Sequence, residues 1–345
     1  MSGLVAVLDG GWAVTVQDRG RVGSRRFGVP QSGALDPLLL AAANALVANP
    51  PDAAGLEVPL PGPTLAVIDG PLRLALAGAV AAVITRADGR QASLEPWTTV
   101  TLWPGDRIKI GAPRHGPAYV GIAGGFLVPP QLGSRSTYLR AAIGGVEGRA
   151  IRAGDRIACG AVAGDARTEC RAAAAWTAET GPIRVIPGPQ DDHFPPAAWE
   201  QFRQAAFTVT RDVDRMGLRL AGPPLTHNDQ GAEISSDAVV PGAIQVPADG
   251  QPIILLADGQ TTGGYAKIAT VISADLPRLG HLRPGDRVAF VTVTMVEAVA
   301  ARRRQAEAFA AWAAGIAPMT AAGTIDPLAL YGGNLISGVV TGDDR

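Results

Sequence analysis

The sequence contains very little lysine and very little cysteine. Arginine carries almost all of the positive charge, and Lys109 and Lys267 are the only two lysines among 345 residues. The two cysteines, Cys159 and Cys170, are too few for a disulfide framework and form no Cys-x-x-Cys pair that could hold zinc. Because lysine is so scarce, the position of each lysine is informative.

Long apolar runs and an excess of one charge are also absent. The formal net charge is -1, and charges of both signs are spread along the chain, which argues against nucleic acid or an anionic membrane as the main partner. The N-terminus has no positive run followed by an apolar core, so no signal peptide is expected. The longest apolar stretch, residues 75–84, is about half of what spans a bilayer. We therefore expect a soluble, cytoplasmic protein.

Several familiar catalytic and binding motifs are missing. The sequence has no P-loop, no Gly-x-Gly-x-x-Gly after a strand and no Gly-x-Ser-x-Gly elbow. The four histidines lack the spacing of metal ligands, so no metal is predicted. There is no Met-Lys-Met site for biotin attachment, and another chain would have to carry biotin if it is used.

Glycine (43 residues) and proline (28 residues) are frequent and scattered. Short runs rich in β-branched residues lie between them, which is typical of barrels or sandwiches built from many short strands. The predicted strands are residues 4–8, 13–16, 72–77, 98–102, 118–122, 183–186, 207–210, 253–257, 269–272 and 288–293.

Three helices are predicted. The first begins with Asp36 as N-cap and Pro37 at the first helical position, and it runs to Val47. The second fits residues 196–205. The third spans residues 296–314, with three successive arginines on a solvated face, and a Gly-rich stretch to residue 345 is expected to pack as an arm.

The chain repeats two elements in the same order. Asp-x-x-Arg-x-Gly stands at residues 18–23 and 212–217, and Pro-Gly-Asp-Arg stands at residues 104–107 and 284–287, with a weaker copy at residues 153–156. The second element also has a local explanation, because glycine supplies turn geometry and aspartate bonds to nearby backbone. The shared order nevertheless indicates an ancient duplication.

The duplication predicts two similar β-barrel domains that meet near Ala178. The expected boundaries are residues 1–178 and 179–295 for the two barrels and residues 296–345 for a helical C-terminal arm. A groove between two such domains is a common place for a ligand.

The densest polar segment follows a predicted hairpin at Asp249-Gly250. Its donors, acceptors, close-approach glycines and single cation suit an amide, ureido or carboxylate group. The alternative is a polar turn with a lysine that reaches solvent, but one of only two lysines lies here, which favours function. The segment is expected to be a loop and contains Gln260, Thr261, Thr262, Gly263, Gly264, Tyr265 and Lys267, with Gln245 in the preceding strand.

Other polar turns are weaker candidates. Gln190 lies in a rigid turn that is either a ligand loop or a helix start. Asp214 and Arg215 are slightly more typical of an ion pair that braces a turn. Ser32 precedes the first helix as a turn residue, and an anion at that helix start is the lesser interpretation. Arg135 lies in a small-residue loop that either binds an anion or is an ordinary arginine-braced turn.

Together these segments resemble the allophanate hydrolase subunit 2 family. This family includes the C subunit of bacterial 5-oxoprolinase, the carboxyltransferase half of urea carboxylase, and a bacillus protein that antagonises a kinase inhibitor. Val213 and Ala266 depart from the family pattern, which often has serine and proline there. The motifs that carry the resemblance stand at residues 16–21, 28–36, 123–125, 132–137, 187–190, 214–217, 242–247 and 260–267.

The resemblance implies tandem cyclophilin-like β-barrels and a separately encoded partner of the allophanate hydrolase subunit 1 family. In 5-oxoprolinase relatives, a third, lactam hydrolase-like subunit joins the pair, and the complex opens 5-oxoproline at the expense of ATP. In urea carboxylase relatives, the pair moves a carboxyl group from biotin to urea. No residue here identifies a nucleotide site.

Three function classes follow: a subunit of a hydrolase that acts on a lactam, a biotin-dependent carboxyltransferase, and a regulatory binding protein. The polar segment before Lys267 favours chemistry or ligand binding over pure regulation. We predict Lys267, Tyr265 and Gln260 as catalytic residues. The predicted substrate-binding residues are Thr261, Thr262, Gly263, Gly264, Gln245, Gln190, Asp214, Arg215, Arg135 and Ser32.

Overall fold

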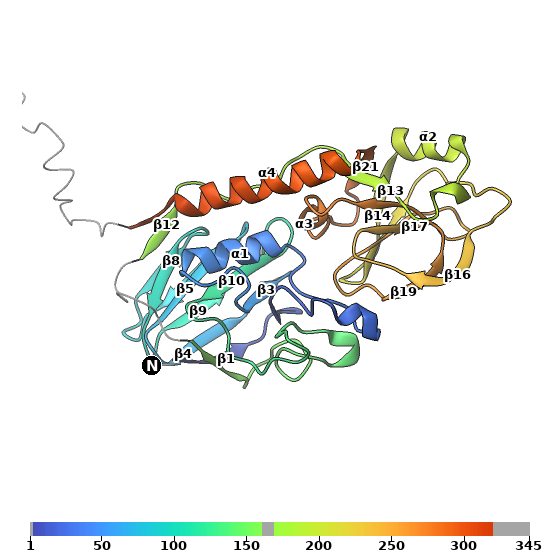
Figure 1. Ribbon diagram of the computed structural model, residues 1–345. Helices are drawn as coiled ribbons and strands as arrows, with labels where there is room; N and C mark the ends of the chain where they lie inside the picture. The colour runs from blue at the N-terminus through green and yellow to red at the C-terminus, as the bar shows by residue number, and fades with distance from the viewer. Residues whose placement is uncertain (1–2, 161–168, 320–345) are drawn as a thin grey trace, which may run out of the picture.

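The computed structural model describes residues 3–160 and 169–319, which form two β-rich halves and a long helix that returns from the second half to the first (Figure 1). The predicted fold class, mainly β with few helices, is confirmed. The described α-helices are α1 (Pro37–Leu46), α2 (Pro196–Gln204), α3 (Leu276–Leu279) and α4 (Met295–Ala314).

The first half encloses its core between two antiparallel sheets. Valines and leucines of both sheets, such as Val5, Leu65, Leu74 and Val120, form one buried cluster. One sheet has the order β11-β1-β4-β9-β6-β7 and the other β2-β3-β10-β5-β8. The strands are β1 (Gly3–Asp9), β2 (Thr15–Gln17), β3 (Gly55–Val58), β4 (Thr64–Asp69), β5 (Leu72–Ala77), β6 (Ala82–Thr85), β7 (Gln91–Leu94), β8 (Thr99–Leu102), β9 (Arg107–Ile110), β10 (Ala118–Ile122) and β11 (Arg156–Cys159).

The second half is a closed seven-stranded barrel with a small extra sheet. Phe202 of α2 stacks on Phe290 inside the barrel, with ring centroids 4.6 Å apart. The barrel order is β13-β20-β17-β18-β15-β14-β21, and β16 pairs with β19 outside this ladder. The strands are β13 (Ile183–Pro187), β14 (Ala206–Val213), β15 (Gly217–Ala221), β16 (Glu233–Ala238), β17 (Ala243–Gln245), β18 (Ile253–Leu255), β19 (Thr262–Tyr265), β20 (Lys267–Val271) and β21 (Arg287–Thr292).

The predicted helices are confirmed with small shifts at their ends. The Asp36 carboxylate accepts hydrogen bonds from the N–H groups of Leu38 and Leu39 at 2.9 and 3.0 Å, which satisfies the exposed N-terminus of α1. The short helix α3 had no clear sequence signal. Residues 320–345 of the predicted C-terminal arm lie outside the described residues.

The three Gly-Asp turns at residues 105–106, 154–155 and 285–286 are built alike. Their glycines have φ values of 91°, 93° and 95°. In each turn the aspartate carboxylate accepts a backbone N–H from three residues earlier, at 2.9, 2.8 and 2.8 Å. The local explanation of these turns is therefore confirmed, while the duplication and the domain boundaries remain predictions.

Helix α4 packs along the first half, above α1 (Figure 1). It begins with a capping box between Thr294 and Glu297. Near its other end, Trp312 packs edge-on against Trp97, with ring centroids 5.9 Å apart, and its Nε1–H donates to the carbonyl of Ala174 at 2.8 Å. The chain then pairs β22 (Ile316–Pro318) with β12 (Cys170–Ala172).

These contacts predict that Trp312 stabilises the attachment of α4. Trp312→Ala should lower the free energy of unfolding by about 2 kcal/mol, less than for a fully buried tryptophan because the ring is partly exposed. Urea denaturation followed by circular dichroism measures this. Arg303→Ala, on the solvated face of α4, is the control, with an expected change within about 0.5 kcal/mol. Equal effects of the two changes would contradict the prediction.

Candidate functional site

A cavity of about 480 Å³ opens on the barrel of the second half. Four predicted site residues, Asp214, Gln245, Gln260 and Tyr265, line it, so the structure brings part of the predicted site together. Sequence reasoning did not assign the other residues of the lining to the site, because nothing in the spacing of the strands marks them as neighbours of Gln260, although four of them belong to the motif at residues 212–217. They are Arg211, Asp212, Val213, Met216, Gly217, Arg219, Ile253 and Leu255.

Two glutamine side chains meet at this cavity. The Nε2–H of Gln260 donates to Oε1 of Gln245 at 3.2 Å. The Nε2 of Gln245 is buried and has no hydrogen-bond partner within the described ranges. A Cβ atom on Gly263 would lie only 2.3 Å from that nitrogen, so a larger residue at this position would displace the Gln245 side chain. The pair therefore has an unused amide donor.

Lys267 lies on β20 directly across from Gln245 on β17. It is 1% exposed, so its side chain does not reach solvent as the polar-turn alternative required. Its Nζ lies 3.7 Å from Oδ2 of the half-exposed Asp237, an ion pair too long for a hydrogen bond. Within residues 3–160 and 169–319, Nζ has no hydrogen-bond partner.

Lys267 does not belong to the lining of the cavity. Its ammonium group is buried, and the Asp237 carboxylate lies beside it. The backbone N–H of Lys267 points to Oε1 of Gln190 at 3.4 Å, which places Gln190 beside the same strand.

The expectation that residues 260–267 form a loop is wrong in part. Residues 262–265 form β19, which pairs with β16 so that Thr262 faces Ala238 and Tyr265 faces Glu233. Glycine is unfavourable in strands and is typical of turns, but backbone pairing with β16 overrides this local preference. Thr262 and Tyr265 are exposed and Thr261 is half-buried, while Gly264 has space beside it.

Arg215 joins the two halves of the chain. Its guanidinium pairs with Asp258 of the second half at 2.9 Å and with Glu57 on β3 of the first half, and it donates to the carbonyl of Gly33 at 2.6 Å. Burial opposes its charge, but the carboxylates of Glu57 and Asp258 outweigh burial and raise the pKa of Arg215. The structure therefore gives Arg215 a bracing position.

Asp214 is not the partner of its neighbour Arg215. Its Oδ1 accepts the N–H groups of Met216 and Gly217 at 2.7 and 3.2 Å, which closes the turn between β14 and β15. The expected ion pair between Asp214 and Arg215 is therefore replaced by two separate interactions. Asp214 stabilises the turn between β14 and β15, and Arg215 forms ion pairs that link the second half to the first.

The loop around Arg135 binds an anion that belongs to the chain itself. The Asp18 carboxylate accepts hydrogen bonds from the hydroxyl groups of Ser134 and Ser136 at 2.6 and 2.5 Å and from the Arg135 N–H at 2.6 Å. The Arg135 side chain instead donates to the carbonyl of Val128 at 2.8 Å. The structure therefore places Arg135 outside the candidate cavity.

Ser32 lies in a second, separate cavity of about 220 Å³ between the two halves. Its N–H donates to the carbonyl of Ala257 at 3.0 Å, and its φ of 55° is unusual for a residue other than glycine. The structure does not bring Ser32 together with Gln260 and Tyr265.

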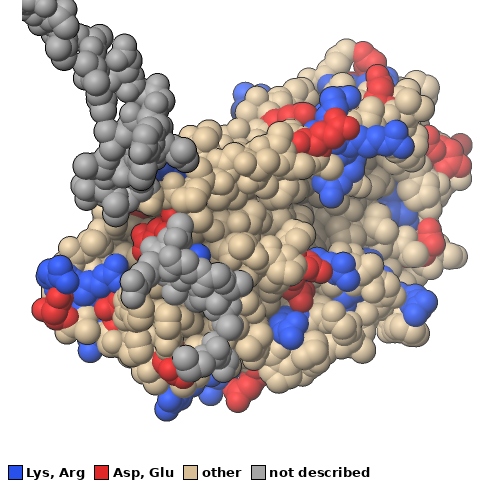
Figure 2. All heavy atoms as spheres, turned by 60° about the vertical axis from the view of Figure 1, so that its left-hand side comes forward, with Lys and Arg blue, Asp and Glu red and all other residues tan. Residues whose placement is uncertain are grey.

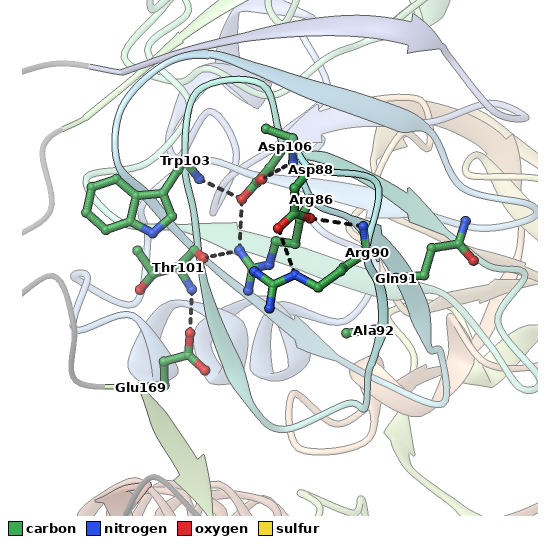
Figure 3. Close-up of a pocket in the computed structure, with 10 residues that line it drawn as sticks. Arg86, Asp88, Arg90, Gln91, Ala92, Thr101, Trp103, Asp106 and Glu169 are labelled. Atoms are coloured by element: carbon green, nitrogen blue, oxygen red, sulfur yellow. Dashed lines mark hydrogen bonds and ion pairs between the residues drawn. The ribbon is translucent and has the colours of Figure 1, made fainter.

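A further cavity, of about 720 Å³, lies in the first half and contains no predicted site residue (Figure 3). Its charged groups already have partners there: Arg86 with Asp106 at 2.8 Å, Arg90 with Asp88 at 2.7 Å, and Glu169 with the N–H of Thr101 at 2.8 Å. This pairing favours a structural explanation of that surface.

Cys159 is not a competing nucleophile. Burial raises the pKa of the Cys159 thiol to about 12, so a thiolate is not available there. Among the residues that the structure describes, no group of three or more His, Cys, Asp or Glu side chains could hold a metal ion. None of the described helices is long and apolar enough to cross a membrane. Charges of both signs are mixed on the face shown in Figure 2.

The sequence model of the protein family "Carboxyltransferase domain, subdomain A and B" matches residues 27–292 of this chain. This chain belongs to that family. It is 36% identical to the 5-oxoprolinase C subunit of Escherichia coli K12 over 313 residues, 89% of this chain and 96% of that protein. A putative urea carboxylase of Emericella nidulans is 29% identical over 316 residues, which cover 86% of this chain and 25% of that protein. The resemblance drawn from the sequence motifs is confirmed.

Solved structures agree with this family. The urea carboxylase of Kluyveromyces lactis matches with a TM-score of 0.80 and 29% identity, and the urea amidolyase of K. lactis with 0.79 and 28%. Both alignments cover 90% of this chain, which spans 29% and 20% of those longer proteins. The chain therefore corresponds to one part of these enzymes and to nearly the whole length of the 5-oxoprolinase C subunit.

The position of Arg215 predicts a large loss of stability when it is removed. Arg215→Met should lower the free energy of unfolding by about 3 kcal/mol, because Glu57 and Asp258 would remain buried without a cation. Arg219→Met is the matched control, since Arg219 and its partner Asp249 are 40% and 52% exposed, and it should cost less than about 1 kcal/mol. Urea denaturation of both variants measures these changes. A loss of unfolding free energy for Arg215→Met that is no larger than for Arg219→Met would contradict the prediction.

Proposed function

We propose that this chain is a subunit of a multi-subunit, ATP-dependent enzyme that opens a small lactam, converting 5-oxoproline to glutamate. The similarity to the 5-oxoprolinase C subunit over 96% of that protein carries this proposal. In this reaction, water adds across the amide C–N bond of the ring, which releases a carboxylate and an amine.

The candidate cavity offers groups that suit a lactam. The unused N–H of Gln245 can donate to a carbonyl oxygen, and the Gln260 carboxamide and the Tyr265 hydroxyl lie around the same cavity. Thr261 and Thr262 carry hydroxyl groups next to Gln260, outside the lining of the cavity. Arg211 and Arg219 supply positive charge for a substrate carboxylate.

In this proposal Lys267 stabilises negative charge that develops on the amide oxygen. An ammonium group without a hydrogen-bond partner in the described structure, enclosed by protein, interacts strongly with such an oxygen. Displacement of Asp237 from its position 3.7 Å away would free the ammonium group for substrate.

We further propose that the chain is cytoplasmic and that it is active only in a complex with partner subunits. These are a sister subunit of the allophanate hydrolase subunit 1 family and a lactam hydrolase-like third subunit. The chain contains no P-loop, and we assign ATP consumption to the assembled complex rather than to a site in this chain.

A biotin-dependent carboxyltransferase is the second candidate function. The family model is named for carboxyltransferase domains, and the similar K. lactis structure is a urea carboxylase. Biotin attached to a separate carrier would present a ureido group, which the amides of Gln245 and Gln260 suit with their donors and acceptors. Urea or a similar small amide would then receive the carboxyl group.

Co-expression with the two proposed partner subunits tests the assembly and the reaction together. We expect a stable complex by size-exclusion chromatography, and glutamate formation from 5-oxoproline that depends on ATP. Carboxylation of urea by a complex with a biotin carboxylase and carrier would favour the second candidate instead. A chain that is fully active alone would contradict the need for partners.

Replacement of Lys267 tests its proposed role. Lys267→Ala should lower kcat of the assembled enzyme on the order of a hundredfold, the usual cost of losing one electrostatic stabiliser. Lys267→Arg should not restore the rate, because a planar guanidinium does not replace a compact ammonium in an enclosed site. Steady-state rates measure both effects.

The other lysine provides the control. Lys109→Ala changes an exposed residue on β9 and should leave the rate unchanged. Circular dichroism and denaturation check the fold of each variant, and Lys267→Met separates loss of charge from loss of volume. A well-folded Lys267→Ala enzyme with the wild-type rate would leave Lys267 as a structural residue.

A further inference from the structure

Arg25 crosses from the first half of the chain to the edge of the candidate site. It lies on the short 3₁₀ helix η1 (Ser24–Phe27), which Figure 1 shows next to the β16–β19 sheet. Its guanidinium donates to three carbonyl oxygens of the second half: Val239 at 2.6 and 3.2 Å, Gln260 at 2.6 Å and Gly259 at 3.3 Å.

These carbonyls lie at one end of the β16–β19 sheet. Val239 directly follows β16, and Gly259 and Gln260 lie shortly before β19. The N–H of Val239 donates to the carbonyl of Thr261 at 3.0 Å, so the two connecting segments are already neighbours. Arg25 therefore holds both strands of the small sheet at their shared base.

Strand β16 and the segment before β19 each carry one group of the candidate site. Asp237, two residues before Val239, is the group paired with Lys267 Nζ. Gln260 gives its backbone carbonyl to Arg25 and its side-chain amide to Gln245. A shift of the base of this sheet would move both contacts.

The chemistry of Arg25 also differs from that of an ordinary ion pair. Among the described residues no carboxylate lies within ion-pair distance of it, and burial lowers its pKa. Carbonyl oxygens alone receive its N–H groups. A planar fork with several fixed donors can bind three carbonyls at once, which a lysine ammonium on a flexible stem does poorly.

We infer that Arg25 is a positioning residue, supplied by the first half, that fixes the β16–β19 sheet and thereby sets Gln260 and Asp237 in the site of the second half. Its role in the reaction rests on the proposed function, whereas its effect on the sheet does not.

Hydrogen exchange and kinetics on the assembled enzyme test this inference. Arg25→Ala should increase amide exchange in residues 233–239 and 259–265 by at least about tenfold, without a change in the first-half sheets. The kcat should fall by about tenfold to a hundredfold, the scale of a small misplacement of site groups. Millimolar guanidinium, far below denaturing concentrations, should partly restore kcat in this variant.

Two further variants sharpen the comparison. Arg25→Lys keeps the charge but should remain defective, because it lacks the fork. Arg26→Ala is the matched control, since the adjacent Arg26 is exposed and lies 4.7 Å from the ring of Phe27. It should match wild type in both exchange and rate.

The outcomes separate this inference from the proposed function. Wild-type exchange and kcat in Arg25→Ala, or a uniform rise in exchange over the whole chain, would overturn the inference even if Lys267→Ala is inactive. If the wild-type complex does not hydrolyse 5-oxoproline, the proposed function fails. If Arg25→Ala nevertheless increases amide exchange selectively in residues 233–239 and 259–265, the effect of Arg25 on the β16–β19 sheet is still supported.

Discussion

One largely buried cation, Arg215, links the two halves through ion pairs to both. Its guanidinium neutralises a carboxylate on each side of the boundary, and Glu57 also accepts the hydroxyl group of the buried Tyr119 at 2.7 Å. Tyr119 in turn accepts the N–H of Asp36 at 2.9 Å, so the start of α1 belongs to the same network. Since an unpaired buried charge is strongly unfavourable, this network favours the observed relative position of the halves. That position allows Arg25 to reach the base of the β16–β19 sheet.

Local features of the fold were predictable because their causes lie within a few residues. Asp36 caps α1 as its position before proline predicts, and residues 72–77 and 118–122 form strands as their apolar runs predict. The hairpin at Asp249-Gly250 joins β17 to β18, with Gly250 at a φ of 73°.

The candidate site was predictable where its residues lie in motifs that the sequence itself marks, as for Asp214 in the Asp-x-x-Arg-x-Gly element. Gln245, Gln260 and Tyr265 were found because they lie in one polar segment. Arg25 and Asp237 were missed, because the bonds of Arg25 to its carbonyls span more than 200 positions and β16 gives no strong strand signal. For the loop around Arg135, one of the two predicted alternatives was anion binding, and the loop does bind a carboxylate. That carboxylate belongs to Asp18, 117 positions away in the same chain. Sequence patterns indicate which groups are suited to bind, while folding decides whether the chain itself already occupies them.

The return of α4 to the first half has a consequence for synthesis of the protein. Domains generally fold from the N-terminus as the ribosome releases them, but the first half receives Phe309 and Trp312 against α1 only after the second barrel has been made. Until then, an apolar surface that includes Leu39 and Trp97 faces solvent in the nascent chain. The order of translation thus leaves the packing around α1 dependent on a segment that is synthesised late.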